Sequence, residues 1–304
     1  MSLDELKRRI RKLAKEKNAV ILAHNYQRPE VQDVADLTGD SLELSLKASQ
    51  TTASLIVFCG VNFMAESASV LCPGKTVLLA HPVAGCPMAE RITAAALLER
   101  RRELNGVPVV TYVNSTAEVK AESDICCTSA NVVSVVRSLP ERRVLMTPDR
   151  NLGLYAQRHT DKELLLWPGY CPVHDGLKVE EVLACKARHP GALFVAHPEC
   201  RPEVLDLADA IRSTTGMLAF CRESKAKTFI IGTEQGLLYP LRRDNPDKVF
   251  VSPSDDLICP DMKLTTLSDV LEALATGCGE VKVPGPVATR ARRAIERMLA
   301  VPRD

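Results

Sequence analysis

The sequence repeats one pattern of apolar and polar residues three times, and this repeat constrains the fold more than any other feature. Each repeat begins with a strand-length apolar run that ends in a polar residue: residues 20–23 precede His24, 109–113 precede Asn114, and 193–196 precede His197. A hydroxyl residue that opens a helical pattern follows 15 to 17 residues later, at Ser41, at Ser129, and at Ser213 and Thr214. A fixed period of this kind is typical of a repeated structural unit.

Two further apolar runs complete each repeat, and one cysteine follows the last of them. The second runs are residues 55–59, 143–147 and 228–232, and the third runs are residues 76–80, 164–167 and 248–252. The cysteines are Cys86, Cys171 and Cys259, which lie 62, 57 and 62 residues after the first polar residue of their repeats. Because strands alternate with helices in each repeat, we expect a parallel sheet covered by helices.

The predicted fold class is therefore α/β, with three homologous three-layer α/β units whose short parallel sheets surround a pseudo-threefold axis. The first unit comprises residues 1–86 together with the terminal segment 260–304. The second unit comprises residues 87–171, and the third comprises residues 172–259. Helical patterns at residues 2–18, 264–275 and 286–300 predict three terminal helices that pack together on the first unit.

Composition excludes several classes of protein. Hydrophobic residues make up 46% of the chain and charged residues 25%, which is typical of a globular protein and not of a disordered one. The formal net charge of +1 gives no basis for nucleic-acid binding, and no apolar run reaches the roughly 18 residues of a membrane helix. The amphipathic N-terminal segment differs from a signal peptide, so we expect a cytoplasmic protein with no nucleic-acid or membrane partner.

Eleven cysteines are unusual in a chain of this kind. Their odd number and the lack of a C-x-x-C pair argue against a disulfide framework, a zinc ribbon and a thioredoxin-like site. One cysteine from each of three loops favours a metal centre. A cubane iron–sulfur cluster with one open iron is the leading interpretation, followed by inert cysteines and by zinc with three cysteine ligands. The roles of the other eight cysteines stay open.

The repeat also predicts that the polar residues converge. In parallel α/β sheets, ligands bind beyond the carboxyl ends of the strands, where His24, Asn114, His197 and the three cysteines are expected. Helix N-termini at the hydroxyl residues would bind carboxylate or phosphate groups. Three units around one axis would bring all of these groups into a single cavity.

Ten short motifs in this order resemble the quinolinate synthase A family, and together they span nearly the whole chain. They are His24-Asn25-Tyr26-Gln27, Gly39-Asp40-Ser41, Ala84-Gly85-Cys86, Tyr112-Val113-Asn114, Cys127-Thr128-Ser129-Ala130-Asn131, Gly169-Tyr170-Cys171-Pro172-Val173-His174, His197-Pro198-Glu199-Cys200, Ser213-Thr214, Gly232-Thr233-Glu234 and Cys259-Pro260-Asp261-Met262-Lys263. Ten ordered motifs are far more specific than any one of them.

The resemblance implies three α/β units with pseudo-threefold symmetry and a [4Fe–4S] cluster held by Cys86, Cys171 and Cys259. It also implies an enzyme of NAD biosynthesis, a transferase or synthase. Its reaction would condense iminoaspartate with dihydroxyacetone phosphate to quinolinate, with loss of phosphate and water. Transient contact with L-aspartate oxidase, which would hand over unstable iminoaspartate, is left open.

Roles in the site follow as expectations from the resemblance. The predicted catalytic residues are Glu199 as the leading acid or base, Tyr26 as a second proton donor, and His24, which also binds substrate. The predicted substrate-binding residues are His24, Ser41, Tyr112, Asn114, Ser129, His174, His197, Glu199, Ser213 and Thr214. Ser41, Ser129 and Thr214 would hold carboxylate or phosphate groups, and His174 would bond substrate or a cluster sulfur.

The chain departs from the family pattern in two places. Some members carry a C-x-x-C-x-x-C run at the third cysteine, whereas this chain has only Cys259 with Asp261, which excludes a disulfide switch there. The His81-Pro82 pair before Cys86 also differs from the acidic loop that the family pattern suggests. Two competing functions are a different iron–sulfur hydro-lyase acting on a dicarboxylate, and a metal-stabilised sensor or electron carrier without turnover.

Overall fold

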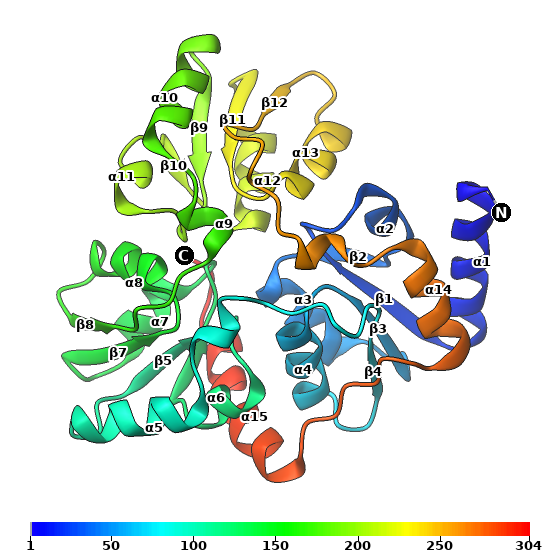
Figure 1. Cartoon of the computed structure of the whole chain (residues 1–304), viewed down its shortest axis with the longest axis horizontal. Helices are drawn as coiled ribbons and strands as arrows, with labels where there is room; N and C mark the ends of the chain where they lie inside the picture. Colours follow the sequence, from blue (N-terminus) through cyan, green and yellow to red (C-terminus); the bar gives the residue numbers. More distant parts are fainter. Residues whose placement is uncertain (1) are drawn as a thin grey trace.

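The computed structural model describes residues 2–304, whose strands form three four-stranded parallel sheets (Figure 1). The first sheet contains β1 (Ala19–His24), β2 (Leu37–Gly39), β3 (Leu55–Cys59) and β4 (Thr76–Leu79). The second contains β5 (Val109–Tyr112), β6 (Ile125–Cys127), β7 (Arg143–Thr147) and β8 (Glu163–Leu166). The third contains β9 (Leu193–Ala196), β10 (Ala210–Ile211), β11 (Thr228–Gly232) and β12 (Val249–Val251).

Each repeat builds the same sheet. The strand orders are β2-β1-β3-β4, β6-β5-β7-β8 and β10-β9-β11-β12, and every pairing is parallel. The predicted α/β fold class is confirmed, and the three predicted strands of each unit are present. A fourth strand, β2, β6 or β10, was not predicted, because a run of two or three residues shows no measurable alternation. It pairs with the first strand of each sheet, which thereby becomes an interior strand.

Helices cover the faces of the sheets. The first unit contains α2 (Pro29–Val34), α3 (Ser41–Gln50) and α4 (Asn62–Leu71). The second contains η1 (Ala89–Arg91), α5 (Ala94–Glu103), α6 (Ala117–Ala121), α7 (Val132–Ser138) and α8 (Arg150–Gln157). The third contains α9 (Pro172–Asp175), α10 (Val179–Arg188), α11 (Pro202–Leu205), α12 (Thr214–Glu223), η2 (Gln235–Leu237) and α13 (Leu238–Asp244). The terminal helices are α1 (Leu3–Glu16) and, after the short η3 (Asp261–Lys263), α14 (Leu267–Thr276) and α15 (Gly285–Leu299).

Local sequence sets the ends of these helices. Ser2 begins α1, because its side chain accepts a hydrogen bond from the backbone N–H of Glu5 at 3.2 Å. Thr266 and Asp269 form a reciprocal capping box at the start of α14. The same helix ends at Gly277, whose φ of 78° is the left-handed conformation that glycine adopts without a steric penalty.

One aspartate in each unit accepts a backbone hydrogen bond from the first half of the first strand. The carboxylates of Asp36, Asp124 and Asp209 accept the backbone N–H groups of Ile21, Val109 and Phe194 at 2.8, 2.8 and 2.7 Å. Each aspartate also pairs with a basic residue of the preceding helix, namely Arg11, Arg101 and Lys186. The repeat therefore extends from the sheet topology to individual hydrogen bonds.

The three sheets share one apolar core. Leu22, Val110 and Val195, on the first strands of the three units, all belong to a single buried cluster. Their neighbours in sequence, such as Ile21 and Phe194, point to the opposite faces and lie in separate clusters under the outer helices. This alternation follows from the two-residue period of a strand. The inner faces hold the three units together around the centre of the molecule (Figure 1).

The terminal helices do not all pack where they were predicted. Helices α1 and α14 lie against each other and against the first sheet, as expected. Helix α15 instead packs mainly on α6 and β6 of the second unit and reaches α4 of the first. Its apolar stripe, which includes Ile295 and Met298, enters the shared core, so burial there outweighs contact with α1. The predicted unit boundaries at residues 86, 171 and 259 stay a prediction.

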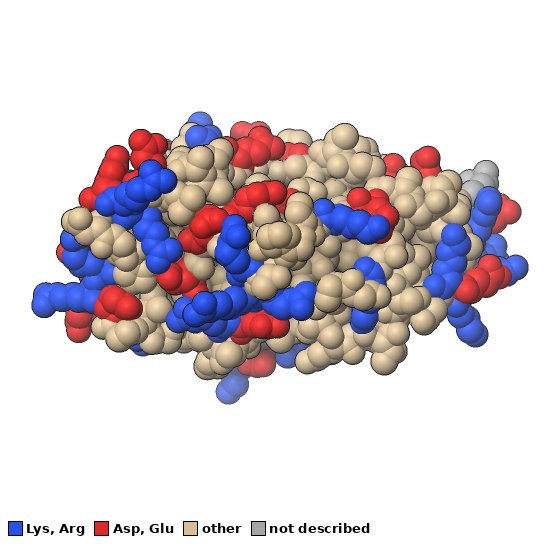
Figure 2. Space-filling model, turned by 90° about the horizontal axis from the view of Figure 1, so that it is seen from below, with Lys and Arg blue, Asp and Glu red and all other residues tan. Residues whose placement is uncertain are grey.

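The surface carries charges of both signs, as the formal net charge of +1 predicts. On the face shown in Figure 2, Lys and Arg side chains lie interspersed with Asp and Glu. Among residues 2–304, no helix combines the length and apolar character that crossing a membrane requires.

Replacing Asp124 by Asn should destabilise the second unit. An amide has one acceptor oxygen and no charge, so it cannot serve both the N–H of Val109 and the guanidinium of Arg101. We expect the free energy of unfolding to fall by about 1–2 kcal/mol in urea denaturation. The exposed Asp161→Asn is the control, with a change of about 0.5 kcal/mol or less. An unchanged denaturation midpoint in Asp124→Asn would contradict the assigned role.

Candidate functional site

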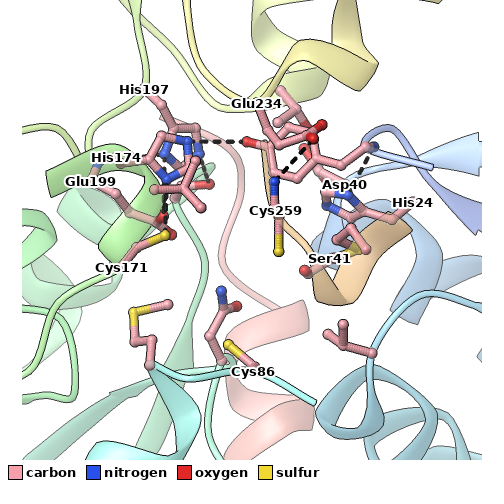
Figure 3. Close-up of a pocket in the computed structure, with 18 of the residues that line it drawn as sticks. His24, Asp40, Ser41, Cys86, Cys171, His174, His197, Glu199, Glu234 and Cys259 are labelled. Atoms are coloured by element: carbon pink, nitrogen blue, oxygen red, sulfur yellow. Dashed lines mark hydrogen bonds and ion pairs between the residues drawn. The ribbon is translucent and has the colours of Figure 1, made fainter. Parts of the chain in front are cut away.

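A cavity lies where the carboxyl ends of the three sheets meet (Figure 3). It is lined by His24, Tyr26, Asp40, Ser41, Val61, Phe63, Gly85, Cys86, Met88, Tyr112, Asn114, Thr128, Ser129, Cys171, Val173, His174, His197, Glu199, Thr214, Glu234, Cys259 and Met262. All three units contribute to this lining. The convergence that the repeat predicts is therefore present in the structure.

All but one of the predicted site residues line this cavity, and the exception is Ser213. Its hydroxyl caps α12 by accepting the backbone N–H of Gly216 at 3.3 Å, and it lies 3.3 Å from Asp40 Oδ2. Ser129 lines the cavity but does not open a helix, because α7 begins at Val132 with Asn131 as its N-cap residue. The expectation of a helix start at each hydroxyl residue is wrong for Ser129, which lies in the turn before α7.

The two strand-end histidines share one local geometry. His24 Nδ1 accepts the backbone N–H of Tyr26 at 3.1 Å, and His197 Nδ1 accepts that of Glu199 at 3.4 Å. These bonds assign the ring proton of a neutral imidazole to Nε2. Nε2 of His197 lies 3.2 Å from the hydroxyl of Ser129 in the cavity wall. Burial lowers the pKa of His24 to about 4 and that of His197 to about 3, so both rings are neutral near pH 7.

Glu199 lies buried at the end of a chain of hydrogen-bonding groups. Its Oε2 is 2.6 Å from His174 Nδ1 and 3.8 Å from His197 Nδ1. His174 Nε2 lies 2.8 Å from the hydroxyl of Thr233, which is 2.5 Å from the hydroxyl of Tyr26. The chain Glu199–His174–Thr233–Tyr26 thus links a carboxylate to a phenol across the cavity wall.

The carboxylate and the phenols have opposite protonation preferences. Burial raises the pKa of Glu199, but the neighbouring imidazoles and hydrogen bonds outweigh burial and lower that pKa overall. Because His197 is neutral near pH 7, we regard His174 as the partner that keeps Glu199 ionised. Burial and the charge of Glu199 raise the pKa of Tyr26 and Tyr112 well above the ordinary range. The site therefore combines an ionised base with two phenols that stay protonated.

Cys86, Cys171 and Cys259 each come from a different loop, and their sulfur atoms point toward the same space (Figure 3). All three are partly exposed, whereas the other cysteines are buried except for the exposed Cys278. Burial raises the pKa of Cys86 to about 12 and of Cys259 to about 11, and it also raises the pKa of Cys171 well above the ordinary value. Such thiols are poor nucleophiles at pH 7, whereas a metal cation would displace their protons. Their chemistry suits metal ligation.

Asp40 is a wall residue for which the sequence predicted no role. Its Oδ1 accepts the backbone N–H of Glu43 at 3.0 Å, so this carboxylate occupies the N-terminal end of α3 beside Ser41. Arg303 binds both oxygens, at 2.8 and 3.1 Å, and lowers the pKa of Asp40 against the effect of burial. The N-terminal end of α3 thus already holds a carboxylate paired with an arginine, and the anion site expected at Ser41 stays a prediction.

Two more carboxylates were missed, although the repeat contained their signal. Asp149 follows β7 and Glu234 follows β11, each two residues after the last residue of the strand. Glu234 lines the cavity, and both carboxylates are buried. A comparison of equivalent positions in the second and third repeats would have singled them out.

Lowering the pH should destabilise the protein, because His24 resists protonation in the folded state. Its pKa is about 4 when folded, against 6.5 for an ordinary histidine, so the unfolded chain gains a proton first as the pH falls. The resulting stability is lost between pH 6.5 and pH 4, with a loss of about 2 kcal/mol at pH 5 relative to pH 7. His24→Gln should lose about that much less between these pH values in urea denaturation. The exposed His159→Gln is the control, and an identical pH dependence in His24→Gln and wild type would refute the assignment.

Comparison with known proteins identifies the family. The sequence model described as quinolinate synthetase A protein matches residues 8–300. Quinolinate synthase of Geobacter metallireducens is 58% identical over 304 residues, which is 100% of both chains. Quinolinate synthase of Methanoregula boonei is 55% identical over 296 residues, covering 97% of this chain and 98% of the relative. Quinolinate synthase of Dehalococcoides mccartyi is 51% identical over 301 residues, 99% of this chain and 100% of the relative. The chain therefore belongs to the quinolinate synthetase A family of enzymes.

Proposed function

We propose that this enzyme condenses iminoaspartate with dihydroxyacetone phosphate to form quinolinate, with loss of phosphate and water, in NAD biosynthesis. One observation carries the proposal: one cysteine from each unit faces the cavity that also holds an ionised carboxylate, neutral histidines and protonated phenols. The names of the relatives support the product. A sensor or electron carrier would have no need of these acid and base groups.

The three cysteines fit a [4Fe–4S] cluster with one iron left open. A cubane cluster takes thiolate ligands, and three of them leave one iron without a protein ligand. Such a cluster, when bound, would supply a Lewis acid that polarises an oxygen of the substrate. The partial exposure of these three cysteine residues favours this assignment over that of inert buried cysteines.

Neutral donors suit the binding of a dicarboxylate and a phosphate. His24 and His197 donate through Nε2 without adding a charge, and the hydroxyls of Ser129 and Thr214 line the same cavity. The Oδ1 atom of Asn114 is buried and has no hydrogen-bond partner among residues 2–304. A buried acceptor without a partner costs about 1–3 kcal/mol, which an N–H or O–H group of a bound substrate would recover.

Proton transfers would run through the carboxylate and the phenols. Glu199 would accept a proton from the substrate at a carboxylate oxygen, because its lowered pKa keeps it unprotonated near pH 7. Tyr112, which is hydrogen-bonded to Glu199, would hold its proton for donation. His174 and Thr233 connect Glu199 to the hydroxyl of Tyr26. A proton that Tyr26 donates can therefore be replaced by the proton that Glu199 has taken up. Such groups typically contribute about 10²–10⁴-fold to a rate.

A zinc site is the alternative that one observation favours. Cys171, His174 and Glu199 offer ligand atoms that all lie within 4.8 Å of one another, and zinc accepts all three ligand types. Zinc bound there would take Glu199 out of acid–base chemistry. Metal analysis distinguishes the two centres.

Changing the three cysteines to serine one at a time tests the metal centre. The wild-type protein, purified without oxygen, is expected to contain about four irons and four sulfides per chain. Cys86→Ser, Cys171→Ser and Cys259→Ser should each lose most of this content, while the exposed Cys278→Ser should retain it. Stoichiometric zinc in place of iron would favour the alternative site, and iron unaffected by all three changes would overturn the proposal.

Replacing Glu199 by Gln tests the proposed base. The amide keeps the shape of the side chain but cannot accept a proton, so quinolinate formation should fall by about 10²–10⁴-fold. The iron content should stay at the wild-type value, because Glu199 is not a ligand in the cluster assignment. Glu203→Gln, on the exposed side of α11, is the matched control and should keep full activity. Loss of iron together with activity would point to Glu199 as a metal ligand.

The predicted cytoplasmic location and transient contact with L-aspartate oxidase extend this proposal. The instability of iminoaspartate is the chemical reason for such a contact. Both stay predictions.

A further inference from the structure

We propose that Asp149, Glu234 and Asp261 are positioning residues that fix the backbone of the three cysteine loops. The proposal rests on the proposed function, because it assigns these carboxylates to a cluster held by the three cysteines. Each carboxylate accepts a backbone N–H group from a ligand cysteine or from the residue directly before one. None of them is required as an acid or base in the proposed proton path.

In the second unit the carboxylate is Asp149, which is fully buried. Its Oδ1 accepts the backbone N–H of Leu152 at 2.7 Å, and its Oδ2 accepts that of Cys171 at 3.0 Å. Both oxygens are therefore engaged, one by its own helix and one by the cysteine loop. The loop approaches so closely that a Cβ atom on Gly169 would lie 2.4 Å from the carbonyl oxygen of Pro148. Only glycine fits at that position.

In the third unit Glu234 repeats this arrangement. Its Oε2 accepts the backbone N–H of Gly236 at 2.7 Å, and its Oε1 accepts that of Cys259 at 3.2 Å. Lys263 Nζ lies 2.8 Å from Oε1 and balances the charge of this buried carboxylate. Two units of the repeat thus use the same position after the strand for the same bond to a ligand cysteine.

In the first unit a different residue holds the cysteine loop. Its equivalent position, two residues after β3, is Val61, whose side chain has no acceptor atom. Asp261, two residues after Cys259, supplies one instead: its Oδ1 accepts the backbone N–H of Gly85 at 3.0 Å. The segment that follows the third cysteine therefore holds the loop that leads to the first. This hydrogen bond gives a structural role to Asp261, which stands where some family members have a cysteine-rich run.

Carboxylates are suited to this task. A carboxyl group can accept a hydrogen bond at each of its two oxygens, so Asp149 and Glu234 each hold two N–H groups at a fixed separation. Fixing the N–H of a ligand cysteine fixes the backbone from which its sulfur is directed. The loops would then be arranged before the cluster binds, which lowers the cost of ordering them. Outer residues of this kind typically contribute 10–100-fold to metal affinity.

The test compares iron release with overall stability. Asp149→Asn and Glu234→Gln keep the size of each side chain, but the amide nitrogen cannot accept the second N–H group. Asp124→Asn is the matched control, because Asp124 also holds a backbone N–H but at the opposite end of its sheet. Each protein is prepared without oxygen with its cluster, and iron release to a ferrous chelator is followed together with the thermal unfolding midpoint.

We expect iron release to be about tenfold faster in Asp149→Asn and Glu234→Gln than in the wild type. The control should release iron at the wild-type rate although its stability falls. Asp261→Ala should also accelerate release, because it removes the acceptor for the backbone N–H of Gly85 and so frees the loop of Cys86. Each of these variants tests the proposal alone, so one that fails to fold leaves the other two decisive.

The outcomes separate the two proposals. Wild-type protein that binds no iron and sulfide would overturn the proposed function, and this inference with it. If the wild-type cluster is stable and the variants of Asp149, Glu234 and Asp261 release iron at the wild-type rate, the positioning role is wrong while the proposed function stands. Faster release in the control as well would show a general loss of stability and would also contradict a positioning role.

Discussion

The shared apolar core is the constraint on which the rest of the structure depends. Each sheet turns one face outward to its own helices and the other toward the neighbouring units, as Ile21 and Leu22 illustrate on β1. No single unit can bury its inner face alone, so the three sheets must meet. Because all strands within a sheet are parallel, packing the inner faces together also brings the polar ends of the first strands to one place. The cavity is a consequence of this packing.

Burial within that cavity determines which groups carry charge. It makes His24 and His197 neutral and keeps the phenols of Tyr26 and Tyr112 protonated. Glu199 is ionised, since a close contact with His174 outweighs the cost of burying its charge. An ionised base beside protonated phenols suits the proton transfers proposed above.

Carboxylates recur as backbone anchors at both ends of the sheets, partly or fully exposed at one end and buried at the other. Asp36, Asp124 and Asp209 hold the starts of the first strands, and Asp149 and Glu234 hold the loops beyond the opposite ends. The first group has a basic partner in every unit, whereas in the second group only Glu234 has one, Lys263. The repeat is therefore most regular where it supports the fold. It diverges near the cavity, where the units differ in the residues they contribute.

The sequence by itself determined the fold class, the main strands and the residues at their ends, because hydrophobic periodicity and repeat spacing are local properties that chain order records directly. The repeat spacing also predicted that the three cysteines lie at one cavity, and all three line it. Only the tertiary structure decided that Ser213 turns away to cap α12, that α15 crosses to the second unit, and that Asp261 reaches the loop of Cys86. The contacts of α15 and of Asp261 join residues far apart in the chain, and the exclusion of Ser213 from the cavity depends on how the units pack, which no local pattern encodes.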